Sequence, residues 1–428
     1  MLPKSEREEI IALINREVVP AIGCTEPIAV ALCVARAREI LGVEPEHIEV
    51  LLSANILKNA MGVGIPGTDM IGLPIAVALG ALIGRSAYQL EVLKEVNPAA
   101  VEQGKKYLAA ERITIGLKEN ITEKLYIEVA VTTTGHKAMA IIAGGHTSFV
   151  YESLDGKAML DQRTQTGSEE QSAEVSLNLQ KVYDFATTTP LDEIRFILET
   201  MRVNKAAAER SFKANYGHCL GKTLRNADEV RVMGDSVFCH ILSYTSAACD
   251  ARMAGAMIPV MSNSGSGNQG ITATLPVVVY AEENQASEEQ MIRALTLSHL
   301  TVIYIKQSLG RLSALCGCVV AATGSSCGIT YLMGGEYKEI SFAVKNMIAT
   351  LTGMICDGAK PSCALKLTSG VSTAMLSAML AMGQRCVSSV EGIIEDDVDK
   401  CIRNLTTIGR DGMNETDRLI LKIMTSKQ

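Results

Sequence analysis

The sequence predicts an α+β protein, with a mixed helix and antiparallel-sheet domain in residues 1–172 and a mostly α-helical domain in residues 173–428. Alternation of apolar and polar residues, which is typical of strands, is confined to the first part, in residues 47–53, 112–118, 125–134 and 137–145. Beyond about residue 175, apolar positions recur at helical spacing. Residues 152–174 are polar and lack periodicity, so the domain boundary is expected there.

Helices are also expected in the first part. Residues 5–17 carry apolar side chains at helical spacing, and a second helix begins near Cys24, with Pro27 in its first turn. A glycine-rich loop leads into a third helix from about residue 71, and residues 90–109 form a fourth. Strands and helices therefore alternate in the first part.

The second part is predicted to be a bundle of helices, in residues 175–186, 190–208, 234–258, 287–309, 340–351 and 372–382. A polar loop at 261–271, with the sequence MSNSGSGNQGI, interrupts this pattern. The chain has 35 Gly and no Trp, and such small side chains favour closely packed helices.

Composition excludes several classes of function. A formal net charge of −7 without a basic cluster gives no reason to expect a nucleic-acid partner. The longest apolar run, residues 71–84, contains a proline and is shorter than the ~20 residues that span a bilayer. The charged N-terminus does not resemble a signal peptide. We therefore expect a cytoplasmic protein without a membrane partner, whose cysteines stay reduced, and large apolar helical faces make a homodimer plausible.

Five of the twelve cysteines fall within residues 316–363, near glycine-rich breaks between helices. Such turns let thiolates converge on an iron–sulfur cluster, although the sequence has no CxxCxxC run. Zinc is a second possibility, but no histidine lies beyond residue 300. Because cysteine is one of the most buried residue types, packing in the core is the third interpretation.

Other segments are candidates for chemistry. Cys24 lies at a predicted helix N-terminus, where the dipole lowers a thiol pKa, or it is a small buried capping residue. The loop at 263–269 is dense in hydrogen-bond donors that could bind a carboxylate or phosphate. His146, at a strand end, is either a base or a structural histidine. Lys58 could form a Schiff base with pyridoxal phosphate.

Five motifs, in chain order, resemble those of the L-cysteine desulfidase family, which is similar to the oxygen-sensitive iron–sulfur L-serine dehydratases. They are AIGCTEPIAVAL (21–32), ILKNAMGVGIPGT (56–68), MSNSGSGNQGI (261–271), LCGCVVAATGSSCG (315–328) and MICDGAKPSCALK (354–366). The resemblance spans nearly the whole chain.

This resemblance implies a [4Fe–4S] cluster held by Cys316, Cys356 and Cys363, with one iron open to substrate. Cys318 competes with Cys316 as a ligand and ranks second. Cys24 matches a cysteine of the family's N-terminal motif. The implied substrate-binding residues are Thr25, Asn263, Ser264, Ser266 and Asn268.

Two departures from the dehydratases concern the base and the ligands. The dehydratases have Ser-Ser-Ser-His-Thr where this chain has Gly23, Cys24 and Thr25, so base and substrate can differ. The gap between Cys356 and Cys363 is also shorter here than in the dehydratases.

The implied reaction is a β-elimination that converts L-cysteine to pyruvate, sulfide and ammonia. An open iron would act as a Lewis acid, and Cys24, with His146 as the alternative, would remove the Cα proton. Three other readings stay open: an L-serine dehydratase with the same mechanism, a pyridoxal phosphate lyase that uses Lys58, and an iron–sulfur or redox sensor without turnover.

Overall fold

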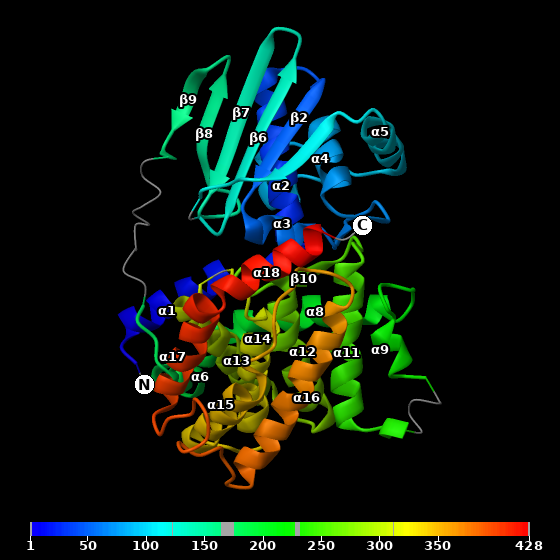
Figure 1. The fold of residues 1–428 in the computed structure, drawn as a ribbon. Helices are drawn as coiled ribbons and strands as arrows, with labels where there is room; N and C mark the ends of the chain where they lie inside the picture. The colour runs from blue at the N-terminus through cyan, green and yellow to red at the C-terminus, as the bar shows by residue number, and fades with distance from the viewer. Residues whose placement is uncertain (1, 122, 164–174, 227–231, 311, 427–428) are drawn as a thin grey trace.

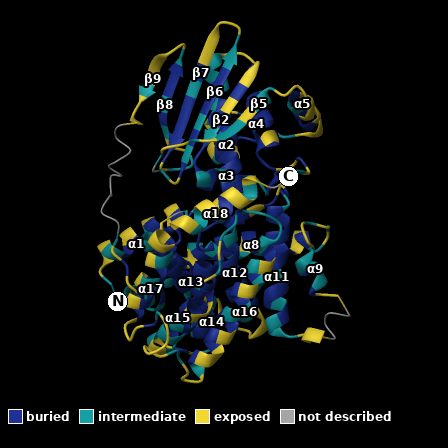
Figure 2. Cartoon of the chain, viewed as in Figure 1, coloured by how far each residue is buried: buried dark blue, intermediate teal, exposed yellow. Residues whose placement is uncertain are grey.

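A computed structural model describes residues 2–121, 123–163, 175–226, 232–310 and 312–426. Figure 1 shows a sheet with its own helices above a larger body of helices. Each part has a large hydrophobic core of its own, and Figure 2 shows both interiors as buried. The predicted α+β class is confirmed.

The upper part is built on one six-stranded sheet with the order β5-β2-β6-β7-β8-β9. Its strands are β2 (His47–Leu52), β5 (Ile113–Leu117), β6 (Tyr126–Thr133), β7 (His136–Ala143), β8 (Phe149–Leu154) and β9 (Lys157–Asp161). All neighbours pair antiparallel except β2 and β5, which are parallel. Strand β9 falls in the segment expected to be irregular. Its residues are mostly exposed at the sheet edge, so no apolar alternation reveals it.

Helices α2 (Thr25–Leu41) and α4 (Leu73–Leu82) pack on the sheet, while α3 (Ala54–Ala60) packs on α2 and α5 (Pro98–Ala109) packs on α4. Helix α2 packs on β6 and β7 and is buried along most of its length. Helix α4 approaches α2 closely at Gly80, where a Cβ would lie 2.6 Å from the carbonyl oxygen of Ala31. The helix expected at 90–109 begins only at Pro98, after a short 3-10 segment, η1 (Ser86–Glu91). This packing fixes the start of α2 at the lower edge of the sheet layer.

The helical body is assembled around α13 (Glu288–Leu309) and α14 (Gly317–Leu332). Its other elements are α6 (Leu179–Thr188), α7 (Leu191–Ile194), η3 (Arg195–Ile197), α8 (Leu198–Ser211), α9 (Leu220–Thr223), α11 (Val237–Met253), α12 (Gly267–Glu283), α15 (Tyr337–Leu351), α16 (Cys363–Met382), α17 (Val398–Thr407), η4 (Ile408–Gly412) and α18 (Asn414–Thr425).

The two ends of the chain cross between the parts. Helix α1 (Lys4–Glu17) packs into the core of the helical body, and strand β1 (Pro20–Ile22) pairs with β10 (Pro259–Met261). Helix α18, drawn in red in Figure 1, returns to α3. A two-stranded ribbon, β3 (Gly64–Ile65) with β4 (Met70–Ile71), replaces the expected glycine loop. The predicted boundary between residues 172 and 173 lies outside the described residues, and the division stays a prediction.

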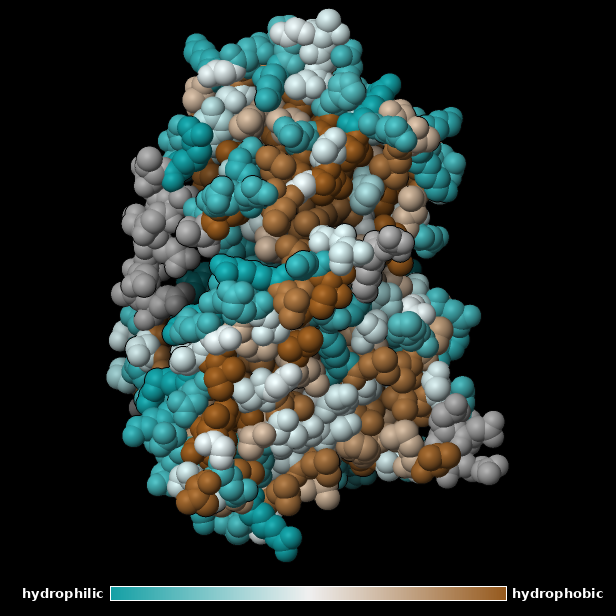
Figure 3. All heavy atoms as spheres, viewed as in Figure 1, coloured by the Kyte–Doolittle hydropathy of each residue, from teal (hydrophilic) through white to brown (hydrophobic). Residues whose placement is uncertain are grey.

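Helix α16 begins at Cys363, nine residues before the expected start at 372. Within the described ranges it is the one helix long and apolar enough to cross a membrane, a test that core helices also pass. It packs against α11, α14 and α15, and Gly370 brings it against Cys318 of α14. Its outer face exposes Leu365, Leu376 and Met379, and Figure 3 shows hydrophobic side chains on the surface of the helical body.

Candidate functional site

A cavity of about 100 Å³ lies where the starts of α2, α12, α14 and α16 meet. Side chains from α3 and α11 complete it. Its lining residues are Cys24, Glu26, Asn59, Arg252, Gly265, Ser266, Asn268, Gln269, Cys316, Gly317, Cys318, Cys356, Gly358, Ala359, Cys363, Lys366 and Leu367. The structure thus brings together residues from all five motifs, which the sequence spreads over residues 21–366.

The three predicted cluster ligands all line this cavity. Cys316 is the N-cap residue of α14, and Cys363 is the first residue of α16. Cys356 lies in the loop between α15 and α16, where its backbone N–H donates to the carbonyl of Ala314 at 2.7 Å. The backbone N–H of Cys316 in turn donates to Met354 at 2.9 Å. These bonds hold the Cys316 and Cys356 segments side by side.

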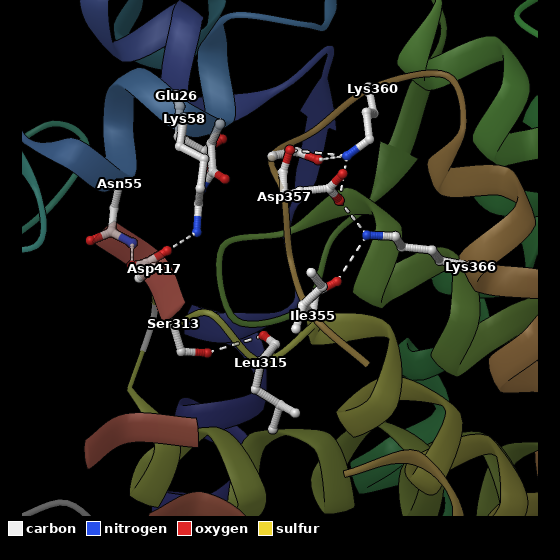
Figure 4. Close-up of polar contacts among 12 residues, drawn as sticks. Glu26, Asn55, Lys58, Ser313, Leu315, Ile355, Asp357, Lys360, Lys366 and Asp417 are labelled. Atoms are coloured by element: carbon white, nitrogen blue, oxygen red, sulfur yellow. Dashed lines mark hydrogen bonds and ion pairs between the residues drawn. The ribbon is translucent and has the colours of Figure 1, made fainter. Parts of the chain in front are cut away.

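Positive charge lies beside these thiols. The Nζ of Lys366 donates to the carbonyl of Ile355 at 2.8 Å and pairs with Asp357, which also pairs with Lys360 (Figure 4). Burial alone would raise the pKa of Asp357, but hydrogen bonds from both lysines hold it at about 2. The two lysines therefore share one carboxylate and leave net positive charge near the thiols.

The cysteines respond differently to this environment. A hydrogen bond with the Cys318 thiol lowers the pKa of Cys316 to about 7, and Lys366 and Lys360 add to this effect against burial. Burial raises the pKa of Cys363 to about 11 and also raises that of Cys356. A thiol loses its proton when it binds a metal. Metal binding would therefore compete with protons at Cys356 and Cys363, whose pKa values are raised.

The donor set suits an iron–sulfur cluster better than a single ion. Among the described residues, no three Cys, His, Asp or Glu side chains are grouped closely enough to hold one metal ion. Three thiols around one cavity match a cluster, because each thiolate binds a different iron and the ligands are spread apart.

The two other cysteines of the stretch have different surroundings. The Cys318 thiol lines the cavity but donates to the carbonyl of Lys366 at 3.1 Å, and its hydrogen bond with Cys316 raises its pKa well above the usual range. Cys327 is buried in the middle of α14 and does not line the cavity, so the expectation that each cysteine lies at a helix break is wrong for this residue. The choice of Cys316 over Cys318 stays a prediction.

Cys24 is the N-cap residue of α2, as expected, and its side chain enters the cavity. Its thiol donates to Oε2 of Glu26 at 3.0 Å, and Nδ2 of Asn59 donates to the other oxygen at 3.1 Å. Burial and the Glu26 carboxylate raise the pKa of Cys24, while Arg252 opposes them. The prediction that the helix end lowers this pKa is therefore wrong, because desolvation exceeds the dipole effect.

The predicted substrate loop divides into two groups. Ser266, the N-cap of α12, and Asn268 line the cavity. Asn263 and Ser264 are buried behind it, and the Ser264 hydroxyl donates to Oδ1 of Asn263 at 2.8 Å. Thr25 is also outside the lining, but its hydroxyl donates to the carbonyl of Gly265 at 3.2 Å and ties the start of α2 to the loop.

Two candidate residues lie elsewhere. His146 lies on the turn between β7 and β8 and does not line the cavity. Lys58 is 1% exposed and is paired with Asp417 of α18, to which Asn55 also donates at 2.6 Å (Figure 4). Lys58 does not line the cavity either. The structure therefore does not bring this candidate for a Schiff base to the cavity that the polar loop at 261–271 lines.

Sequence reasoning gave no role to four polar lining residues: Glu26, Asn59, Arg252 and Lys366. Gln269, which also lines the cavity, belongs to the predicted loop at 263–269. Charged residues within a helical pattern usually face solvent, so Arg252 gave no signal beyond its place in an Ala-rich and Cys-rich helix.

A missed histidine supports the loop from behind. His299 of α13 is fully buried, where its Nδ1 accepts from Nδ2 of Asn263 at 3.0 Å and its Nε2 lies 3.0 Å from the hydroxyl of Thr274. Burial lowers the pKa of His299 from 6.5 to about 3, so the ring is neutral in the folded chain.

This histidine makes stability depend on pH. Between about pH 6.5 and 3, the unfolded chain takes up a proton at His299 that the folded chain refuses, so the free energy of unfolding is expected to fall as the pH falls. The loss is about 2 kcal/mol at pH 5. Urea unfolding of His299→Gln should show a shallower pH slope than wild type. The exposed His47→Gln serves as the control, and equal slopes for wild type and His299→Gln would contradict the prediction.

Comparison with known proteins agrees with this geometry. Residues 87–422 match the model of the serine dehydratase alpha chain family. The chain belongs to this family. This serine dehydratase alpha chain homologue is 74% identical to a UPF0597 protein of Bacteroides thetaiotaomicron over 424 residues, 99% of each chain.

More distant relatives cover the chain equally well. The identity is 56% to a UPF0597 protein of Porphyromonas gingivalis, over 99% of each chain, and 43% to one of Aeromonas hydrophila, over 99% of this chain and 98% of the relative. The predicted likeness to the serine dehydratases is confirmed, and a serine dehydratase-like lyase is the class of this chain.

Proposed function

We propose that this chain is an iron–sulfur lyase that eliminates the β-substituent of L-cysteine to give pyruvate, sulfide and ammonia. Elimination of water from L-serine by the same mechanism is the alternative. The observation that carries the proposal is one cavity in which Cys316, Cys356 and Cys363 face the Cys24–Glu26 pair and the loop before α12.

Cys316, Cys356 and Cys363 would hold a [4Fe–4S] cluster with one open iron. The chemistry that a bound cluster supplies is that of a Lewis acid for the leaving sulfur or oxygen. The nearby Lys366 and Lys360 offset the negative charge of thiolate ligands. A thiolate is a soft donor that suits iron, and this favours sulfur over oxygen as the leaving atom.

The chain's own acid–base pair would remove the Cα proton. Glu26 accepts the hydrogen bond of the Cys24 thiol, so the thiol proton passes to this carboxylate as the thiolate takes the substrate proton. The electron pair of the broken Cα–H bond becomes the Cα=Cβ double bond of aminoacrylate, and the β-substituent leaves with the electron pair of its own bond to Cβ. Hydrolysis of the aminoacrylate gives pyruvate and ammonia. His146 is disfavoured as the base because it does not line the cavity.

The pyridoxal phosphate alternative has less support, because Lys58 is held by Asp417 outside the cavity. A sensor without turnover needs neither the Cys24–Glu26 pair nor the polar loop. All twelve cysteines are free thiols, which suits a reducing cytoplasm as the proposed location. The homodimer stays a prediction.

The deciding experiment is anaerobic purification followed by assays of iron and acid-labile sulfide. The same preparation is then tested for pyruvate formation from L-cysteine and from L-serine. We expect iron, labile sulfide and a higher kcat/KM for L-cysteine. Iron-free protein that is fully active would overturn the cluster proposal, whereas a preference for L-serine would overturn only the substrate assignment.

A further inference from the structure

The cavity holds a buried positive charge without an acidic partner. Arg252, near the end of α11, is 3% exposed and lines the cavity. Its Nη1 donates to Oδ1 of Asn268 at 3.0 Å, while its Nε has no hydrogen-bond partner. Within the described ranges Arg252 makes no ion pair. Of the five N–H groups of the guanidinium, one thus donates to a protein acceptor among the described residues.

Local structure accommodates this guanidinium without neutralising it. A Cβ at Gly267 would lie 2.2 Å from the Nε of Arg252, so only glycine lets the start of α12 approach so closely. Asp250, one half-turn earlier on α11, accepts from the backbone N–H of Gly221 at 3.1 Å and forms no ion pair with Arg252. Burial of an unpaired charge is unfavourable, and this favours binding of a negative group from outside the chain.

Unpartnered acceptors also line the same cavity. Oδ1 of Asn59 and Oε1 of Gln269 are buried without a hydrogen-bond partner. The Glu26 carboxylate, bonded to Nδ2 of Asn59, adds negative charge on that side. The two amide oxygens and the Glu26 carboxylate suit the ammonium group of a ligand. The paired N–H groups of a guanidinium match both oxygens of a carboxylate group.

We propose that Arg252 is the carboxylate anchor of the cavity, which binds the α-carboxylate of a small amino acid and selects against amines that lack one. The proposal deepens the function proposed above and rests on it for the nature of the substrate. Lysine is a poor replacement, because a point charge cannot reproduce two parallel hydrogen bonds.

The test is calorimetric titration of the anaerobically purified protein with L-alanine and L-alaninamide. L-Alanine has both charged ends but no leaving group, and L-alaninamide lacks the carboxylate. Arg252→Gln is expected to weaken binding of L-alanine about 10- to 100-fold, the range for a charged hydrogen-bonded pair, and to leave binding of L-alaninamide unchanged. Arg252→Lys should give an intermediate loss.

A matched control is Arg38→Gln, since Arg38 is a half-buried arginine of α2 whose Nε also lacks a partner but which does not line the cavity. It should bind L-alanine like wild type. If Arg252→Gln folds and keeps the wild-type ratio of its affinities for L-alanine and L-alaninamide, the proposal is overturned. If Arg252→Gln does not fold, the same ratio is measured on Arg252→Lys, and an unchanged ratio again overturns the proposal. Arg252-dependent binding of L-alanine without any elimination from L-cysteine or L-serine would refute the lyase function and leave the anchor standing.

Discussion

Replacing Cys363 with serine is expected to remove the iron and the lyase activity of the purified protein together. Its thiol opens α16 and faces the same cavity as Cys316 and Cys356. Serine is a hard and weakly acidic oxygen donor, so one of three protein ligands would be lost. Iron should fall from about four atoms per chain toward zero, and turnover should fall to the detection limit. Iron assay, visible absorbance and pyruvate formation measure the outcome.

The matched control is Cys327→Ala, which removes a buried thiol from the middle of α14, outside the cavity. This variant should keep its iron and most of its activity, with a loss only of stability. Cys318→Ala addresses the remaining ambiguity, because Cys318 lines the cavity beside Cys316. Loss of iron in Cys318→Ala together with its retention in Cys316→Ser would replace Cys316 by Cys318 in the ligand set, whereas retention of iron in Cys363→Ser would contradict ligation by Cys363.

Local rules were enough to predict where the cysteines of the site lie along the chain. Proline in the first turn and glycine before it mark the start of α2, so Cys24 could be placed at a helix end from its neighbours alone. Small residues around Cys316 likewise mark the start of α14. These features depend on a few consecutive residues, which is the range over which sequence patterns are informative.

Long-range packing explains what the sequence did not reveal. Asn59 bonds Glu26 across 33 positions, and Asp417 pairs with Lys58 across 359. Arginine is usually exposed, but Arg252 is as buried as a residue of the core. Only the folded chain shows that these charges meet around a cavity or across α3 and α18. The choice among the candidate ligands and bases depends on such contacts.

The pKa of Cys24 illustrates the same limit. A helix N-terminus stabilises a thiolate by about 0.3–1 kcal/mol when it is exposed. The sequence places Cys24 at such an end but does not disclose that the thiol is 3% exposed and faces the Glu26 carboxylate. Both effects favour the thiol form, so Cys24 needs a proton acceptor to become a base. Glu26 is that acceptor in the proposed mechanism.

Replacing Cys24 with alanine is therefore expected to abolish turnover while the cluster survives. The change removes the group that takes the Cα proton, a contribution of roughly 10²- to 10⁴-fold in general base catalysis. It leaves Cys316, Cys356 and Cys363 in place. Glu26→Gln should also lower kcat, because an amide cannot take the thiol proton. Iron content, the visible spectrum and pyruvate formation are measured on the same anaerobic preparations.

Two comparisons separate a chemical role of Cys24 from a structural one. Cys24→Ser keeps a small polar N-cap but raises the pKa of the side chain. A structural role of Cys24 therefore predicts a near-normal kcat for this variant. A role as the base predicts a loss of kcat close to that of Cys24→Ala. His146→Gln, on the turn between β7 and β8, should leave kcat unchanged. Full activity of Cys24→Ala with loss of activity in His146→Gln would assign the base to His146. That result would require the sheet to move toward the cavity during turnover, because His146 does not line the cavity in this structure.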